Sequence, residues 1–135
     1  MFEVRFRRLD DSKTEITIKP KLGKIRQMLR RKGFSDVQAE IVVQLYALNP
    51  LFIHAYDVKA VMNIRRNGME GVRLHIRLHR VTNIDILYDR GSDLYIVEGY
   101  TFKGVEPVRV RRYDMVFWDE LDNVIRKILS YPYEP

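Results

Sequence analysis

The stretch GVRLHIRLHR, residues 71–80, decides the fold class that the sequence predicts. Apolar side chains take every second position and basic ones the positions between, in the order Val72, Arg73, Leu74, His75, Ile76, Arg77, Leu78 and His79. Side chains two residues apart share one side of a β-strand, so this period predicts a strand with one apolar face and one basic face. The apolar face belongs to a core, and the basic face is left to solvent or to a ligand.

Further strands are predicted on the C-terminal side of this stretch, at residues 84–88, 93–102 and 107–113. Arg90-Gly91-Ser92 has the composition of a tight turn between the first two of them. Short turns join antiparallel neighbours, because a parallel crossover needs about a dozen residues or more. The second half of the chain therefore predicts an antiparallel strand meander.

Helical spacing of apolar residues marks four segments. They run from Leu22 to a stop at Gly33, from Ser35 to Asn49-Pro50, from Asp57 to a stop at Asn67-Gly68, and from Met115 to Leu129. Ser35 with Gln38 three residues later is a capping-box pattern, which fixes the start of the second segment. Three helices are thus expected before the meander and one after it.

The N-terminal residues alternate apolar and polar side chains on both sides of the polar segment Asp10-Asp11-Ser12-Lys13. We expect a β-hairpin there, ended by Pro20. The order is then an N-terminal β-hairpin, three helices, an antiparallel strand meander and a C-terminal helix. This order predicts an α+β fold with a single layer of helices on a mainly antiparallel sheet. Residues 1–135 are expected to form a single domain, with residues 130–135 as a tail.

The composition excludes several classes of protein. The chain has no cysteine, which excludes disulfides and thiolate metal sites. No apolar run approaches the roughly 18 residues of a membrane-spanning helix, and the N-terminus lacks the apolar stretch of a signal peptide. We therefore expect a cytoplasmic protein without a membrane span.

The formal net charge is +6, and it is unevenly distributed along the chain. Residues 1–68 hold 14 basic and 7 acidic side chains, whereas residues 69–135 hold 10 basic and 11 acidic ones. Seven basic side chains fall between residues 19 and 32 with no acid among them. An anionic partner would relieve this repulsion; a solvated helix face balanced by the acidic C-terminal part is the competing explanation.

Arginine outnumbers lysine 16 to 8, and the guanidinium fork suits phosphates and bases better than it suits a lipid surface. We therefore expect a small basic protein that binds the phosphate backbone of DNA or RNA without catalysis. The candidate binding residues lie on the first helix and on the basic sides of two strands. They are Lys24, Arg26, Arg30, Arg31, Arg73, His75, Arg77, His79, Arg109 and Arg111.

A second pattern involves two carboxylates on consecutive predicted strands, Asp85 and Glu98, each between apolar residues. It resembles the core of the restriction-endonuclease-like metal nucleases, in which an Asp and a Glu-x-Lys hold Mg²⁺ and activate water. The resemblance implies, as the alternative function, a Mg²⁺-dependent or degenerate nuclease domain that uses these two acids. Tyr100 stands at the lysine position, with Lys103 as the substitute. A Glu98 paired across the strands is the competing interpretation.

A third alternative is a protein–protein adaptor or a homodimer, in which the basic stretch meets Asp119, Glu120 and Asp122 of another subunit. Histidine adds no metal site, because His75 and His79 stand four residues apart on a predicted strand and cannot share an ion. No cofactor is predicted apart from the Mg²⁺ of the nuclease alternative.

Overall fold

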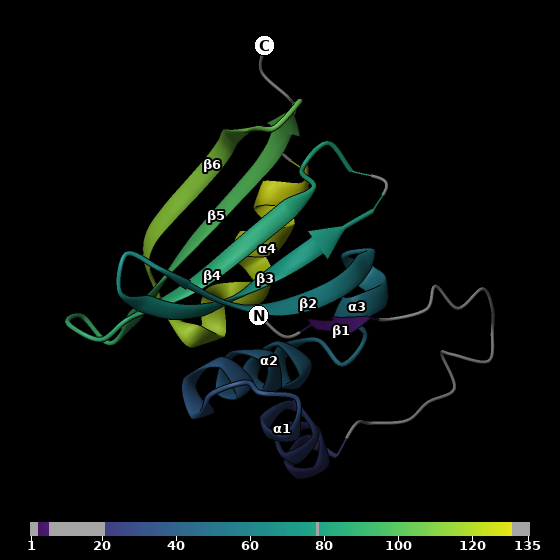
Figure 1. The fold of residues 1–135 in the computed structure, drawn as a ribbon, viewed down its shortest axis with the longest axis vertical. Coiled ribbons are helices and arrows are strands. Elements are labelled where there is room, and N and C mark those ends of the chain that lie inside the picture. The colour runs from purple at the N-terminus through teal and green to yellow at the C-terminus, as the bar shows by residue number, and fades with distance from the viewer. Residues whose placement is uncertain (1–2, 6–20, 78, 131–135) are drawn as a thin grey trace.

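The computed structural model describes residues 3–5, 21–77 and 79–130, and it shows the predicted α+β fold. In these residues six antiparallel strands form one sheet and lie in it in their order along the chain (Figure 1). They are β1 (Glu3–Arg5), β2 (Val58–Arg66), β3 (Met69–Ile76), β4 (Asn83–Asp89), β5 (Leu94–Lys103) and β6 (Glu106–Val116). The meander predicted from alternation is confirmed, with β2 added in front of it.

The helices pack on one face of this sheet. They are α1 (Leu22–Arg31), α2 (Asp36–Leu48), α3 (Phe52–Ala55) and α4 (Leu121–Ser130), the last preceded by the 3₁₀ turn η1 (Trp118–Glu120). In Figure 1, α4 crosses behind the sheet, and α1 lies beyond α2, away from β5 and β6. The other face of the sheet carries no helix of the described residues.

The core lies between the helices and the apolar side chains of one sheet face. The sheet contributes alternate residues of its central strands: Val72, Leu74, Ile84, Ile86 and Val97. The helices contribute the residues that face them: Ile41, Leu45, Leu121, Ile125 and Ile128. Burying one such side chain stabilises the fold by about 1.5–3 kcal/mol, so the apolar period decides which side of each strand turns inwards.

The start of α2 is built as the sequence predicts. The backbone N–H of Gln38 donates to Ser35 Oγ at 3.2 Å, and the Ser35 N–H donates to Gln38 Oε1 at 2.8 Å. This capping box satisfies two backbone donors that the helix itself leaves unpaired. The stop after α1 is confirmed as well, because Gly33 takes a φ of 97° that favours glycine.

The third predicted helix is wrong, because residues 58–66 form the strand β2 and pair with β3. Val58, Val61 and Ile64 stand three residues apart, which imitates helical spacing, but all three are β-branched and favour a strand. Asn67-Gly68, predicted to stop a helix, is the two-residue turn of the β2–β3 hairpin, with φ values of 51° and 77°. Positive φ at both positions is what a type I′ turn requires, and Asn-Gly is its preferred sequence.

Other boundaries also differ from the prediction. α4 begins at Leu121 instead of Met115, because β6 continues to Val116. Of the predicted N-terminal hairpin, β1 pairs with β2, and the remainder lies outside the described residues. The tail predicted for residues 130–135 begins one residue too early, because Ser130 is the last residue of α4; residues 131–135 lie outside the described residues. Within the described ranges, every helix is too short or too polar to cross a membrane.

Gly99 lets α4 approach β5, and we expect its replacement by alanine to destabilise the fold. A Cβ at this position would stand 2.3 Å from Ile128 Cγ2, far inside van der Waals contact. Gly99→Ala should lower the free energy of unfolding by about 1–3 kcal/mol, the usual cost of overpacking a core. Urea denaturation followed by circular dichroism measures this change. Gly23→Ala, with open space around it, should keep or raise the stability; equal losses in both variants would contradict the packing.

Candidate functional site

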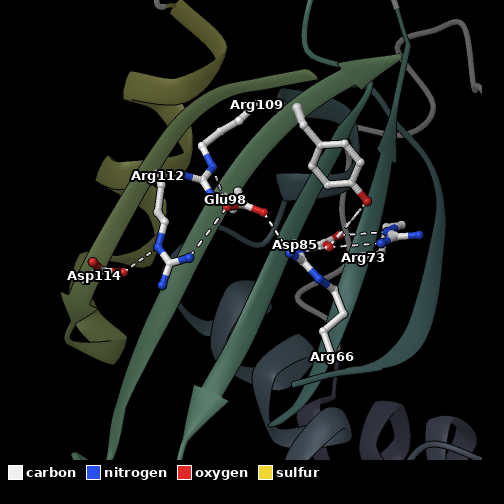
Figure 2. Close-up of polar contacts among 8 residues, drawn as sticks. Arg66, Arg73, Asp85, Glu98, Arg109, Arg112 and Asp114 are labelled. Carbon is white, nitrogen blue, oxygen red and sulfur yellow. Dashed lines mark hydrogen bonds and ion pairs between the residues drawn. The ribbon is translucent and has the colours of Figure 1, made fainter. Parts of the chain in front are cut away.

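Two buried carboxylates lie side by side on the sheet face that no described helix covers. Asp85 on β4 and Glu98 on β5 are paired across the strands and are 0% and 5% exposed. Because Gly99 faces α4, its neighbours Glu98 and Tyr100 project from the opposite face. The site therefore lies on the open face, in the middle of the sheet (Figure 2).

Asp85 is held by two arginines, Arg73 from the adjacent strand β3 and Arg66 from β2, one strand further. Arg66 Nη1 donates to Asp85 Oδ2 at 2.6 Å, and Arg73 donates to both oxygens, from Nε at 2.8 Å and from Nη2 at 3.0 Å. The Tyr100 hydroxyl lies 3.3 Å from each carboxylate oxygen. A buried carboxylate needs such partners, because an isolated ion loses several kcal/mol of hydration when it leaves water.

Glu98 is surrounded by three arginines. Arg66 Nη2 donates to Glu98 Oε1 at 3.0 Å, so that one guanidinium bridges the two acids. Arg109 Nε lies 2.8 Å from Oε2, and Arg112 Nη1 lies 3.8 Å from it. Neither contact has hydrogen-bond geometry, so Oε2 receives no hydrogen bond from the described residues. Arg109 and Arg112 are therefore held at Glu98 by charge alone.

A bulge in β6 determines which arginines reach Glu98. The β5–β6 register shifts within the site and leaves one extra residue on β6. As a result Arg109 and Arg112 both lie beside Glu98 on the open face, although they are three residues apart. Arg111 turns to the opposite face, where its Nε donates to the Tyr113 hydroxyl at 3.2 Å. The prediction that Arg109 and Arg111 share a face is wrong, because strict alternation does not allow for the bulge.

The surroundings keep the arginines charged and the tyrosine neutral. Hydrogen bonds to Asp85 are the main reason why the pKa of Arg73 is raised. Desolvation lowers the pKa of Arg66, but its hydrogen bonds to Asp85 and Glu98 raise it overall. Burial, followed by the charge of Asp85, raises the pKa of Tyr100, so that its hydroxyl stays protonated and able to donate.

A pocket of 330 Å³ opens beside these residues. Its walls are formed by Arg66, Arg73, Glu98, Tyr100, Phe102, Pro107 and Arg109. Phe102 is 47% exposed, and its ring meets that of Tyr100 edge-on at a centroid distance of 5.7 Å. The guanidinium carbon of Arg73 lies 5.3 Å from the centre of the Tyr100 ring. The pocket therefore combines positive charge with an exposed aromatic surface.

The site carries an excess of positive charge. Four arginines surround the two carboxylates (Figure 2). A third acid, Asp114, lies mostly exposed at the rim of the site and pairs with Arg112 at 2.8 Å. A divalent cation would have to displace Arg66 from between the acids. In the described ranges no three acids or histidines converge to hold a metal ion. Because guanidinium groups bind oxyanions, the arrangement favours an anionic ligand over Mg²⁺.

Of the residues in the nuclease-like pattern, the structure brings Asp85 and Glu98 together and leaves Lys103 out. Lys103 is exposed at the end of β5, and the alternation of the strand directs it away from the face that carries Glu98. The arginines beside Glu98 agree with the competing interpretation, a Glu98 paired across the strands. The two acids of the nuclease alternative are therefore adjacent, but Lys103 is not placed beside them.

The basic face of β3 is shorter than its sequence predicts. Arg73 and His75 lie on this strand, which ends before Arg77. His79 lies beyond the strand, and its Nε2 stands 2.9 Å from Asp57 Oδ2. The expectation that four basic residues share one strand face is therefore wrong for Arg77 and His79.

The basic helix α1 forms a separate surface. Arg26 and Arg30 make ion pairs with acids of α2, at 2.9 and 3.0 Å. Lys24 and Arg31 are exposed and make no ion pair with the residues that the structure describes. Since α1 lies beyond α2, the two parts of the predicted binding surface do not meet (Figure 1).

Three residues that shape the site are not among the site residues predicted from the sequence: Arg66, Arg112 and Phe102. Arg66 falls in the segment predicted as a helix, Arg112 is out of step with the alternation of β6, and Phe102 resembles an ordinary core aromatic. The Asn67-Gly68 pair, a preferred β-hairpin turn, is the feature of the sequence that could have placed Arg66 in the site. A hairpin closed there puts Arg66 on the same face as Arg73.

Comparison with known proteins gives no indication of the function. No family model matches the chain, no curated protein sequence matches it, and no solved structure matches its fold. Charge, exposure and geometry are therefore the grounds for a function.

Proposed function

We propose that the protein binds the phosphate groups of a nucleic acid at an arginine cluster formed by Arg66, Arg73, Arg109 and Arg112. The observation that carries the proposal is the gathering of these four side chains around two carboxylates on an open sheet face. Guanidinium groups donate in pairs to phosphate oxygens, and charge-assisted bonds of this kind are about twice as strong as neutral ones.

Arg109 is the member of the cluster best placed to change partner. Its side chain is 60% exposed, and it meets Glu98 without hydrogen-bond geometry. Because the side chain of Glu98 is only 7% exposed, its carboxylate cannot follow the guanidinium into solvent, and a phosphate arriving there offers the hydrogen bonds that Glu98 does not. Arg66 and Arg73 are instead tied to Asp85, and they hold the positive charge in place.

Three features favour nucleic acid over other anions. The pocket offers an aromatic ring beside the guanidinium groups, which suits a ligand that has both phosphates and flat bases. The net charge of +6 attracts a polyanion over a distance. A sheet face extends in two directions and accommodates successive nucleotides, as it does in several RNA-binding folds.

The proposal predicts salt-dependent binding to which Arg109 contributes. A fluorescein-labelled oligonucleotide is titrated with the protein at salt concentrations between about 50 and 200 mM, and fluorescence anisotropy gives Kd. Log affinity should fall linearly with log salt, because each contacted phosphate releases counterions. Arg109→Gln should make the slope shallower by about 0.7–0.9, the value for one phosphate contact.

Arg126→Gln is the matched control. Arg126 on α4 is 61% exposed and pairs with Asp122 at 3.0 Å, so it resembles Arg109 in exposure and pairing but lies on the helical side of the sheet. This variant should keep the wild-type slope. The proposal fails if the wild-type protein binds neither DNA nor RNA at about 50 mM salt. A loss confined to the combined Arg26→Gln, Arg30→Gln and Arg31→Gln variant would move the interface to α1.

A further inference from the structure

We infer that the pocket beside the arginine cluster takes an unpaired base, so that the protein prefers single-stranded nucleic acid to a duplex. This inference rests on the proposed function, since it places the base next to phosphates held by the cluster. It is carried by Phe102, whose side chain is 47% exposed in a pocket otherwise lined mainly by charged residues.

Phe102 is the aromatic ring of the pocket that a ligand can reach. Tyr100 is 6% exposed, donates its hydroxyl toward Asp85 and has the Arg73 guanidinium against its ring. Phe102 follows two residues later on the same face of β5, opposite Pro107 of β6. The interplanar angle of 70° between the two rings is an edge-to-face contact, which fixes the orientation of Phe102 without stacking on it.

The dimensions of the pocket suit a single nucleotide. Its volume of 330 Å³ is at the lower end of the range for small-ligand sites, about 300–1,000 Å³. Arg66 and Arg109 line the same pocket as Phe102. One nucleotide could therefore place its phosphate at the arginines and its base at Phe102 within this pocket. A broad duplex would meet the guanidinium groups at the rim but would not present a base to the ring.

Base stacking explains why single strands would be preferred. In a duplex the faces of the bases are stacked on one another and closed to a side chain. Proteins that bind single strands combine a positive groove with aromatic side chains, and every base has a flat surface that stacks on such a ring. The pocket therefore predicts binding that depends on the presence of a base and little on its identity.

The test compares three labelled probes of about 12 nucleotides. They are oligothymidylate, the same strand hybridised to oligoadenylate, and an abasic strand with the same number of phosphates. Phe102→Ala should weaken binding of oligothymidylate by about five- to a hundredfold, the range for loss of one stacked base. The abasic strand and the duplex should change by less than about twofold, because their contacts are to phosphates alone.

Two further variants serve as controls. Phe102→Tyr keeps a ring in place and should bind oligothymidylate as the wild type does. Phe117→Ala removes a ring that is 56% exposed but does not line the pocket, and it should have no effect. Circular dichroism verifies that each variant is folded, as expected for substitutions of exposed side chains.

Each outcome separates this inference from the proposed function. The inference is overturned if Phe102→Ala weakens binding of the abasic strand as much as binding of oligothymidylate, or if it changes the affinity for neither probe. Salt-dependent binding of all three probes by such a variant would leave the proposed function standing. If no probe binds the wild-type protein at low salt, both are overturned.

Discussion

Asp85→Asn is expected to lower the free energy of unfolding by about 3 kcal/mol, because it breaks a buried ion pair from one side. The substitution keeps the size of the side chain and removes the charge that Arg66 and Arg73 share. Both arginines remain cationic without it, because a guanidinium group does not lose its proton in proteins, and with side chains 32% and 24% exposed they are only partly hydrated. Equilibrium unfolding in urea, followed by circular dichroism, measures the loss.

Asp114→Asn is the matched control for this prediction. Asp114 pairs with Arg112 at 2.8 Å at the rim of the same site, but its side chain is 59% exposed. An exposed pair contributes about 1 kcal/mol or less, so the control should unfold close to the wild type. An equal loss of unfolding free energy in the two variants would contradict the prediction, because it would show that burial does not make the Asp85 ion pairs stronger than the exposed pair of Asp114.

Glu98→Gln should tighten the binding of phosphate chains while it weakens the fold. Glu98 is the acid that faces Arg109, so its neutralisation raises the net charge of the arginine cluster by one. At about 5 Å, one unit of charge contributes about 1–3 kcal/mol to the attraction of a phosphate, before screening by salt. We expect the affinity for an abasic strand or for polyphosphate to rise by about three- to tenfold at about 50 mM salt.

The stability of the same variant should fall by about 1–2 kcal/mol, less than in Asp85→Asn. The difference arises because Arg109 and Arg112 are 60% and 37% exposed and regain hydration when the carboxylate is lost. Anisotropy titrations and urea unfolding of one preparation measure both quantities. Weaker binding of polyphosphate by Glu98→Gln would contradict the view that the cluster acts through its charge.

The central strands could be predicted from the sequence because burial on one side leaves a strict alternation. Val72 and Leu74 face the core while Arg73 between them faces outwards, and no other regular structure produces that period. β2 could not be predicted in the same way. Its apolar residues Val58, Val61 and Ile64 stand three apart, which fits a helical period and breaks strict alternation. A bulge between Val58 and Ala60 breaks the period of the strand, and pairing with β3 is what selects it.

Some members of the site could be predicted from the sequence, but their connections could not. Arg73 and Arg109 are predicted as binding residues, and Asp85 and Glu98 as metal ligands, whereas the structure joins all four in one network. These connections depend on strand register, and a slip of one residue would move a side chain to the other face. Composition and spacing do not determine register, nor do they locate the bulge in β6 that aligns Arg112.

The sequential order of the strands also bears on the path by which the chain folds. From β2 to β6 each strand pairs with the next along the chain, so the sheet grows by closing short loops. Chains dominated by such local contacts fold faster than chains that must first close long loops. Arg73 and Asp85 are 12 residues apart and meet once one hairpin closes, whereas Arg66 and Glu98 are 32 apart and need three consecutive hairpins. The contact between Arg73 and Asp85 is therefore available to a single hairpin, whereas the charged network as a whole is complete only when β5 has joined the sheet.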